Sequence, residues 1–140
     1  MLKKVFVDSD IVLDLLCGRE PFYEPAASLF DLGETGKIKL YTSALVFANV
    51  FFILRKVLGN EQAKTLLRKL ELLLAVLAVD KKTVSLALNS HFQDFEDALQ
   101  YFTARENSLP VLVTRNSKDY QVKDIIVQTA AEYLSGSVFV

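Results

Sequence analysis

Short apolar runs alternate with longer stretches of helical spacing, and this alternation limits how the chain can fold. Residues 5–7 and 111–113 read as buried strands, and polar side chains follow each of them directly. The spacing predicts further strands at 38–41, 75–79 and 138–140, and helices at 9–16, 24–34, 43–58, from 61 onward, 83–89, from 94 onward and 129–134. Such alternation favours right-handed crossovers and an α/β fold whose mostly parallel sheet has helices on both faces.

Composition indicates one globular unit. The chain has 140 residues, of which 51% are hydrophobic and 24% charged, and no Pro-, Gly- or Ser-rich linker divides it, so we expect a single domain over 1–140. The longest apolar run, 72–79, is too short to span a bilayer. Met1 leads straight into a strand instead of a signal segment, so we expect a cytoplasmic protein without membrane contact.

Residue counts exclude several chemistries. Cys17 is the only cysteine and His91 the only histidine. The chain therefore has too few of these residues for a disulfide or a Cys/His zinc site, and Ser-His or Cys-His catalysis would depend on this single histidine. A net charge of -1 gives no overall attraction to nucleic acid, which leaves such binding to local basic patches. Any catalysis must therefore rely on oxygen ligands.

Carboxylates gather where two predicted strands end. Asp8 closes the first strand, and Asp119 lies in the polar segment that follows strand 111–113. Asp97 falls in the first turn of the intervening helix. Ligands of open parallel sheets bind at the carboxyl ends of the strands. We therefore expect Asp8, Asp97 and Asp119 to surround one hollow, with Asp10 close by.

Converging carboxylates create a need for a cation. Two of them about 4 Å apart repel by up to ~4 kcal/mol at an effective dielectric of 20. Three or more will therefore take up protons or bind a metal ion. Oxygen-only ligation favours Mg²⁺ or Mn²⁺, and such an ion can activate water for attack on a phosphate.

Each of these residues also has a structural alternative. Asp8 can simply cap the next helix, and Asp97 is favoured in any first helical turn by the helix dipole. Cap, turn and loop roles are open for Ser43, Asp94, Glu96, Thr114, Asn116 and Asp119, and for Asp10 and Asp14, which can pair with Arg19. The basic residues Arg55, Arg115 and Lys118 can solvate the surface or hold a phosphate backbone.

Four segments resemble, in order, the motifs of the PIN domain family, a metal-dependent nuclease fold that includes the toxin ribonucleases of bacterial toxin-antitoxin pairs. They are VFVDSDIVLDLL, TSALVFANVFFILRK, DFEDALQYFTA and LVTRNSKDY. The resemblance implies a three-layer α/β/α sandwich with a metal site at Asp8, Asp97 and the turn 116–119. It also implies RNA as a more expected substrate than DNA, an antitoxin protein as a partner, and a homodimer.

The chain departs from this family at two positions. Asn49 stands where the family usually has a glutamate, and Asn116 where it often has another acid. Because an amide adds no negative charge, we expect weaker metal binding than a glutamate at position 49 would give. Asn49 also lies among apolar helical neighbours, so its amide should need a partner.

Three functions remain open from the sequence. The first is a nuclease that uses Asp8, Asp97 and Asp119, supported by Asp10, Ser43, Asn49, Asp94, Thr114 and Asn116, with Arg55, Arg115 and Lys118 on the nucleic acid. The second is a PIN fold with little catalysis that binds nucleic acid or protein, which Asn49 favours. The third is a phosphatase, because VFVDSD also fits the haloacid dehalogenase motif with Asp8 as nucleophile and Asp10 as acid/base.

Overall fold

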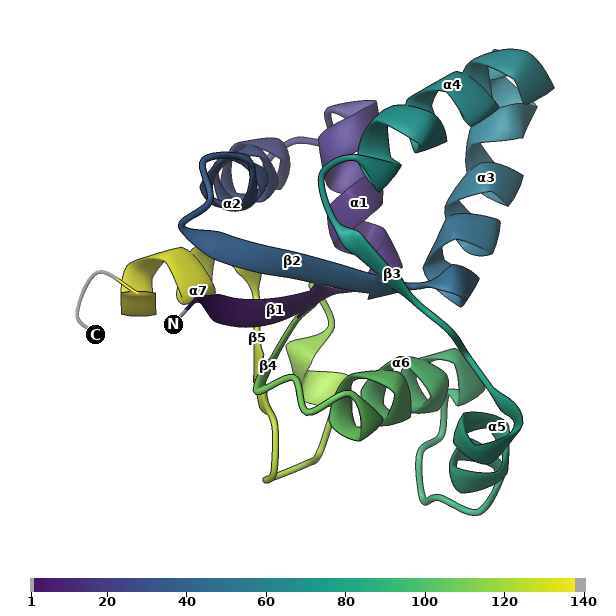
Figure 1. The fold of residues 1–140 in the computed structure, drawn as a ribbon, viewed down its shortest axis with the longest axis vertical. Helices are drawn as coiled ribbons and strands as arrows, with labels where there is room; N and C mark the ends of the chain where they lie inside the picture. The colour runs from purple at the N-terminus through teal and green to yellow at the C-terminus, as the bar shows by residue number, and fades with distance from the viewer. Residues whose placement is uncertain (1, 138–140) are drawn as a thin grey trace.

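The computed structural model describes residues 2–137, and its centre is a five-stranded parallel sheet (Figure 1). The strand order is β3-β2-β1-β4-β5, and every neighbouring pair is parallel. The strands are β1 (Lys3–Val7), β2 (Ile38–Ser43), β3 (Ala75–Leu77), β4 (Val111–Val113) and β5 (Ile126–Gln128). The helices are α1 (Ser9–Cys17), α2 (Tyr23–Glu34), α3 (Ala44–Leu58), α4 (Asn60–Glu71), α5 (Lys81–Leu88), α6 (Phe95–Glu106) and α7 (Ala130–Ser137), with a 3₁₀ turn, η1, at Ser117–Asp119.

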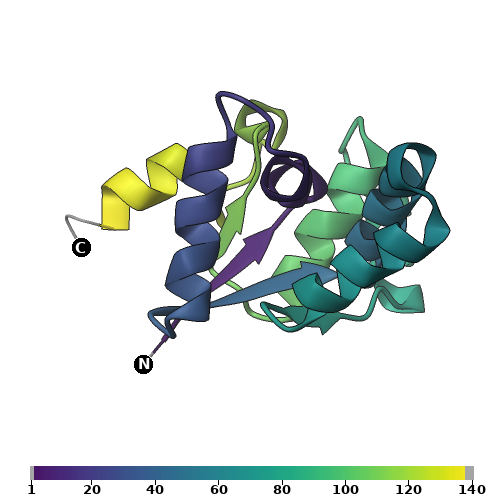
Figure 2. The same ribbon diagram turned by 90° about the horizontal axis from the view of Figure 1, so that it is seen from above.

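Helices cover both faces of this sheet. Helices α1, α2 and α7 lie on one face together with the α3–α4 hairpin, and α5 and α6 lie on the other (Figures 1 and 2). The expected three-layer α/β/α sandwich with a parallel sheet is therefore confirmed.

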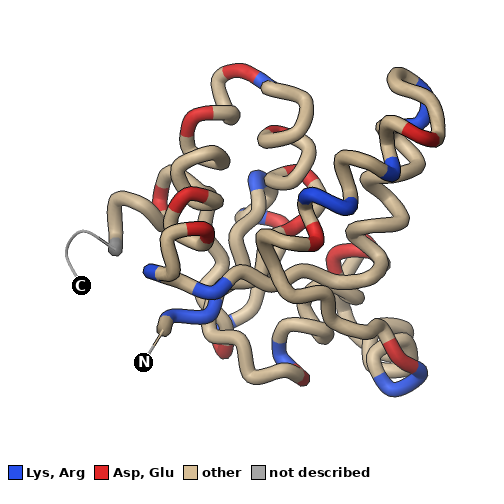
Figure 3. The backbone as a smooth tube through the Cα atoms, turned by 45° about the horizontal axis from the view of Figure 1, so that its top comes forward, with Lys and Arg blue, Asp and Glu red and all other residues tan. Residues whose placement is uncertain are grey.

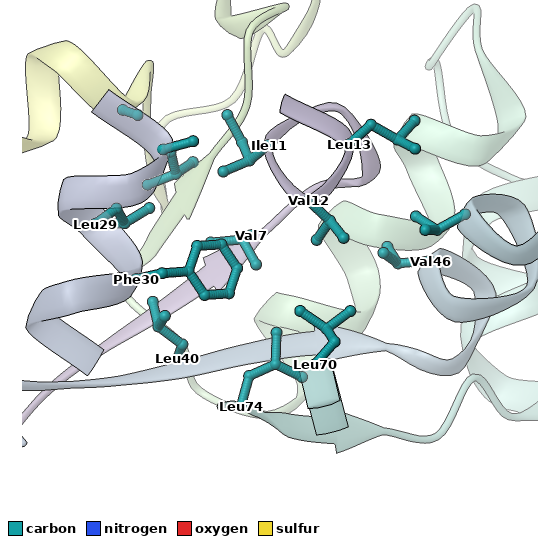
Figure 4. Packing of buried hydrophobic residues seen from close by; sticks show 14 of the residues in the cluster. Val7, Ile11, Val12, Leu13, Leu29, Phe30, Leu40, Val46, Leu70 and Leu74 are labelled. Atoms are coloured by element: carbon teal, nitrogen blue, oxygen red, sulfur yellow. The ribbon is translucent and has the colours of Figure 1, made fainter. Parts of the chain in front are cut away.

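Strand β1 joins the two halves of the core. Val5 and Val7 belong to the cluster under α1 and α2, whereas Phe6 belongs to the cluster under α5 and α6, as the two-residue period of a strand requires. All three side chains are fully buried. Figure 4 shows the first cluster, where Val7 lies near Phe30 of α2 and Val12 of α1. A strand buried on both faces is a rigid support for the residue that follows it, Asp8.

The order in which the chain adds parallel strands to the sheet reverses at β1. It runs outward from β1 to β2 and β3, and then returns to form β4 on the other side of β1. The backbone N–H of Asp8 donates to the carbonyl of Val113 at 3.0 Å, so these two strand ends lie side by side. In open α/β sheets this switch point is where ligands bind.

Side-chain caps fix the starts of the helices around this edge. Ser43 accepts a hydrogen bond from the N–H of Val46, and Asp94 accepts one from the N–H of Asp97, as the sequence predicted. Asp80 caps α5 in the same way, and Asp8 caps α1 by accepting from the N–H of the next residue, Ser9. Each cap satisfies a backbone donor that the helix itself leaves free, so the caps set where these helices begin.

The strands differ from the prediction in two respects beyond small shifts of their ends. Strand β5 was not predicted, and β3 ends at Leu77 instead of 79. The predicted strand at 138–140 lies outside the described residues. Within residues 2–137, no helix has both the length and the apolar character needed to cross a membrane.

Candidate active site

Asp8 lies at the carboxyl end of β1 and has two distinct sets of contacts. Its Oδ1 accepts a hydrogen bond from the N–H of Ser9 at 2.7 Å, which is the capping role. Its Oδ2 accepts from the hydroxyls of Thr114, at 3.0 Å, and Tyr120, at 3.2 Å. The capping alternative and the site prediction therefore both describe this residue, which is only 8% exposed.

Thr114 connects Asp8 to Asp10 from the end of β4. Its hydroxyl lies 3.0 Å from Asp8 Oδ2 and 3.2 Å from Asp10 Oδ2, and the N–H of Arg115 donates to the same Asp10 oxygen at 3.0 Å. The other Asp10 oxygen, Oδ1, is buried without a hydrogen-bond partner among the described residues. The β4 loop therefore orients two acids of the β1 loop and leaves one carboxylate oxygen free to bind something else.

Asp97 reaches the same place from the first turn of α6. The hydroxyl of Tyr120 lies 3.2 Å from Asp97 Oδ1 and 3.2 Å from Asp8 Oδ2, so it stands between the two carboxylates. Acids that are 89 positions apart in the chain thus meet through one tyrosine. This is the convergence that the order of the strands predicts.

The electrostatics of this cluster favour uptake of positive charge. Burial raises the pKa of Asp8 to about 7, with a further increase from the Asp10 charge. Burial and then the Asp94 charge raise the pKa of Asp97 to about 6. The pKa of Asp10 is also raised by burial, against hydrogen bonds from Arg115 and Thr114 that lower it. Ionising these acids together is costly, and a cation among them would reduce that cost.

Asp119 lies at the edge of the cluster. It is exposed, its charge contributes to the raised pKa of Asp97, and both acids line a cleft of about 510 Å³. The other residues of this cleft come from the loop before α6 and from the segment around η1, and they are His91, Phe92, Gln93, Asp94, Lys118 and Gln121. The cleft gives Asp97 and Asp119 access to a large ligand.

The other polar residues predicted to support the site lie farther from its centre. Asn49 donates to Glu96 Oε2 of α6 at 3.2 Å, so its amide has the partner that the sequence required. Ser43 is buried and donates to Gln100 Oε1 of α6 at 2.7 Å. The Asn116 side chain is exposed, and the N–H of this residue donates to Thr114 Oγ1 at 3.2 Å. Their roles at a metal site stay predictions.

Arg115 is bound within the protein. Its guanidinium pairs with buried Asp14 at 3.1 Å and lies over the ring of Phe22, 4.2 Å from the centroid. Asp14 therefore forms its ion pair with Arg115 and not with Arg19. Arg55, at the end of α3, lies over Phe52 instead, while Lys118 lines the cleft. Binding of nucleic acid by Arg55, Arg115 or Lys118 stays a prediction.

Tyr120 is the site residue that sequence reasoning missed. It closes the segment LVTRNSKDY directly after Asp119, and the pattern showed only an aromatic residue at the end of a polar turn. In the structure it is 5% exposed. Burial and the charges of Asp8 and Asp97 hold its pKa well above the ordinary value, so it stays a neutral hydrogen-bond donor. The only available signal was a tyrosine directly after the predicted acid Asp119, since the hydroxyl of a tyrosine needs a partner if it is buried.

The donor set fits a hard divalent cation. It consists of carboxylate oxygens, including the unpartnered Asp10 Oδ1, which Mg²⁺ and Mn²⁺ prefer to nitrogen or sulfur. Over residues 2–137, however, no three Asp, Glu, His or Cys side chains are close enough together to hold an ion as they stand. The Tyr120 hydroxyl occupies the space between Asp8 and Asp97.

Comparison with known proteins agrees with this fold. A family model described as PIN domain matches residues 4–118. Ribonuclease VapC1 of Aquifex aeolicus is 25% identical over 136 residues, which cover 94% of this chain and 93% of that protein.

Solved structures show the same fold. VapBC2 from Rickettsia felis, bound to a DNA fragment from its promoter, superposes with a TM-score of 0.70 at 16% identity over 90% of this chain and 98% of that one. VapC20 of Mycobacterium tuberculosis, a toxin that cleaves the sarcin-ricin loop, gives 0.61 at 18% identity over 77% and 86% of the two chains.

The parallel sheet with acids at its switch point defines the general class, an α/β protein with a polar site at its strand ends. Because the matched model covers most of the sequence, this chain belongs to the PIN domain family. This membership favours the nuclease interpretation of Asp8 and Asp10 over the phosphatase interpretation.

Proposed function

We propose that this protein is a divalent-metal-dependent endoribonuclease that cleaves single-stranded RNA in the cytoplasm, as the toxin of a toxin-antitoxin pair. The observation that carries the proposal is the meeting of Asp8 and Asp97 through Tyr120 at the carboxyl ends of β1 and β4. The similarity to Ribonuclease VapC1 supports RNA as the substrate.

Asp8, Asp97 and Asp119 would hold Mg²⁺ or Mn²⁺, and Asp10, which shares the Thr114 hydroxyl with Asp8, would assist. Such an ion lowers the pKa of a bound water and stabilises negative charge on a phosphate. The chain's own residues prepare this site: Thr114 and the Arg115 N–H fix the directions of Asp8 and Asp10, and β1 provides a rigid base. Lys118 on the cleft wall would bind a backbone phosphate.

The direct test is cleavage of a labelled single-stranded RNA with Mn²⁺ or Mg²⁺ and with EDTA. We expect cleavage only with the metal, and slower or no cleavage of single-stranded DNA of the same sequence. RNA binding without cleavage under every metal condition would instead favour a PIN-fold binding module. Asn49 favours that second function, because its side chain adds no negative charge to the site.

The cleft next to Asp97 provides a platform for an RNA base. The exposed ring of His91 stacks on Phe92 with their centroids 5.5 Å apart, and the amides of Gln93 and Gln121 line the same cleft. Stacking on aromatic side chains and hydrogen bonds to base edges are the usual means of recognising single-stranded RNA. We therefore place an unstacked base against His91.

Replacing His91 by alanine should weaken RNA binding about fivefold or more, because stacking contributes roughly 1–3 kcal/mol per base. The measurement is fluorescence anisotropy of a labelled RNA with variants that also carry Asp8→Asn to prevent cleavage. His91→Phe, which keeps a flat ring, should retain most of the affinity. Leu88→Ala is the control, since Leu88 is exposed on α5 outside the cleft. Equal affinities for the alanine and phenylalanine variants would contradict the stacking.

Replacing Asn49 by glutamate should tighten Mn²⁺ binding, because it adds a negative charge next to α6. Asn49 already contacts Glu96, the residue before Asp97, so the new carboxylate would lie close to the site. Isothermal titration calorimetry with Mn²⁺ measures this, and Asn49→Gln is the neutral control of the same length. Unchanged affinity would show that position 49 lies too far from the ion to matter.

The proposal includes two protein partners, an antitoxin and a second copy of the chain. Several structures with this fold are toxin-antitoxin complexes, from Rickettsia felis, Klebsiella pneumoniae and Salmonella typhimurium. The end of α3 carries exposed apolar side chains, with Val57 82% and Phe52 50% exposed, which would be buried by a partner. Lys and Arg residues occur along the same α3–α4 hairpin (Figure 3).

A further inference from the structure

We propose that the hydroxyl of Tyr120 holds Asp8 and Asp97 together in the cation-free protein, and that a divalent cation must displace this hydroxyl from the carboxylates to bind. The inference rests on the proposed cation site and adds a residue that sets its affinity. Tyr120 acts by positioning the two acids, and it does so through the two 3.2 Å contacts of its hydroxyl.

The ring of Tyr120 is fixed in place. It packs edge-on against Phe92 with their centroids 5.8 Å apart, and it lies in the buried cluster between α6 and the sheet. Its backbone N–H donates to the carbonyl of Ser117 at 3.3 Å, which ties it to η1. The hydroxyl is therefore held at the strand ends by packing as well as by its hydrogen bonds.

The hydroxyl occupies lone pairs that a cation needs. A phenol has one proton, so it can donate to Asp8 or to Asp97 but not to both at once. Asp8 Oδ2 also accepts from Thr114, and Asp8 Oδ1 already caps α1. An ion that coordinates Asp8 through Oδ2 and Asp97 through Oδ1 must therefore take the electron pairs that face Tyr120.

This competition predicts the direction of a substitution. In the free protein the hydroxyl reduces the repulsion between two acids, and this benefit is lost when the cation binds. Replacing Tyr120 by phenylalanine removes the benefit but keeps the ring that packs on Phe92. The free state should become less stable, and Mn²⁺ should bind about tenfold more tightly or better, because a hydrogen bond to a charged group contributes roughly 1.5–3 kcal/mol and about 1.4 kcal/mol is a factor of ten.

Calorimetric titration of Mn²⁺ into the full-length protein, without RNA, tests this. The matched control is Tyr101→Phe, because Tyr101 is also 5% exposed and donates to a carboxylate, Asp124, at 2.6 Å. Both variants should melt at a lower temperature in EDTA, and only Tyr120→Phe should bind Mn²⁺ more tightly. Unchanged or weaker binding by Tyr120→Phe overturns the inference and leaves the cation site standing. No binding by the wild type overturns both.

A second measurement applies if Tyr120→Phe does not fold. The ultraviolet absorbance of a tyrosine changes when its hydrogen bond to a carboxylate is broken, so Mg²⁺ should produce a tyrosine difference spectrum. The spectrum should appear in the wild type and persist in Tyr101→Phe. Its absence from a protein that calorimetry shows to bind Mg²⁺ would mean that the hydroxyl is not displaced.

Discussion

Asp8→Asn is expected to lower the rate of RNA cleavage by about a thousandfold, because it removes a charged cation ligand and with it several kcal/mol of charge stabilisation. The fold should be preserved. Asparagine is as good a cap for α1 as aspartate, and its amide can donate to the hydroxyls of Thr114 and Tyr120 that now donate to Asp8. Single-turnover cleavage of a labelled RNA with saturating Mn²⁺ measures the effect.

The chain offers a matched control for this variant. Asp80 also follows a strand and caps a helix, accepting from the N–H of Thr83 at 2.9 Å, but it is exposed and belongs to neither the acid cluster nor the cleft. Asp80→Asn should cleave at the wild-type rate. If Asp8→Asn keeps more than about a tenth of the wild-type rate, Asp8 does no more than cap its helix.

The second large effect concerns the stability of the metal-free protein, which should fall as pH rises from about 4 to 7. Asp8 binds its proton more tightly in the folded state, with a pKa of about 7 against 3.8 for an ordinary aspartate. Folding is therefore favoured by the protonated form, and this contribution is lost as pH rises. The difference corresponds to on the order of 4 kcal/mol, and Asp97 acts in the same direction.

Urea unfolding in EDTA at several pH values between 4 and 8 measures this effect. Asp8→Asn cannot ionise, so it should be more stable than the wild type at pH 8, and the difference should shrink toward pH 4. Mn²⁺ should remove most of the difference at pH 8 by stabilising the wild type. An asparagine variant that is less stable than the wild type at every pH would mean that the buried carboxylate is not under repulsion.

The sequence was sufficient for the features that depend on local chemistry. The apolar runs that became β1 and β4, and the caps at Ser43 and Asp94, each follow from a few neighbouring residues. The position of Asp8 at the switch point followed from the order of strands and helices, because parallel topology allows few arrangements.

The features that were missed depend on contacts between distant parts of the chain. Strand β5 has only three residues and pairs with β4 alone, so its local signal was weak. The ion pair of Arg115 with Asp14, a buried acid 101 positions earlier, was not expected from the sequence. The bridging place of Tyr120 depends on how α6 and β1 come together, which no local pattern specifies.

Asp8 and Asp97 should hold one divalent cation together. Diffraction from crystals soaked in Mn²⁺, with anomalous scattering measured at the manganese edge, tests it most directly. We predict one strong anomalous peak bonded to oxygens of both Asp8 and Asp97, and no peak there in crystals of Asp8→Asn. A well-diffracting soaked crystal with manganese bound only at other places would contradict the claim.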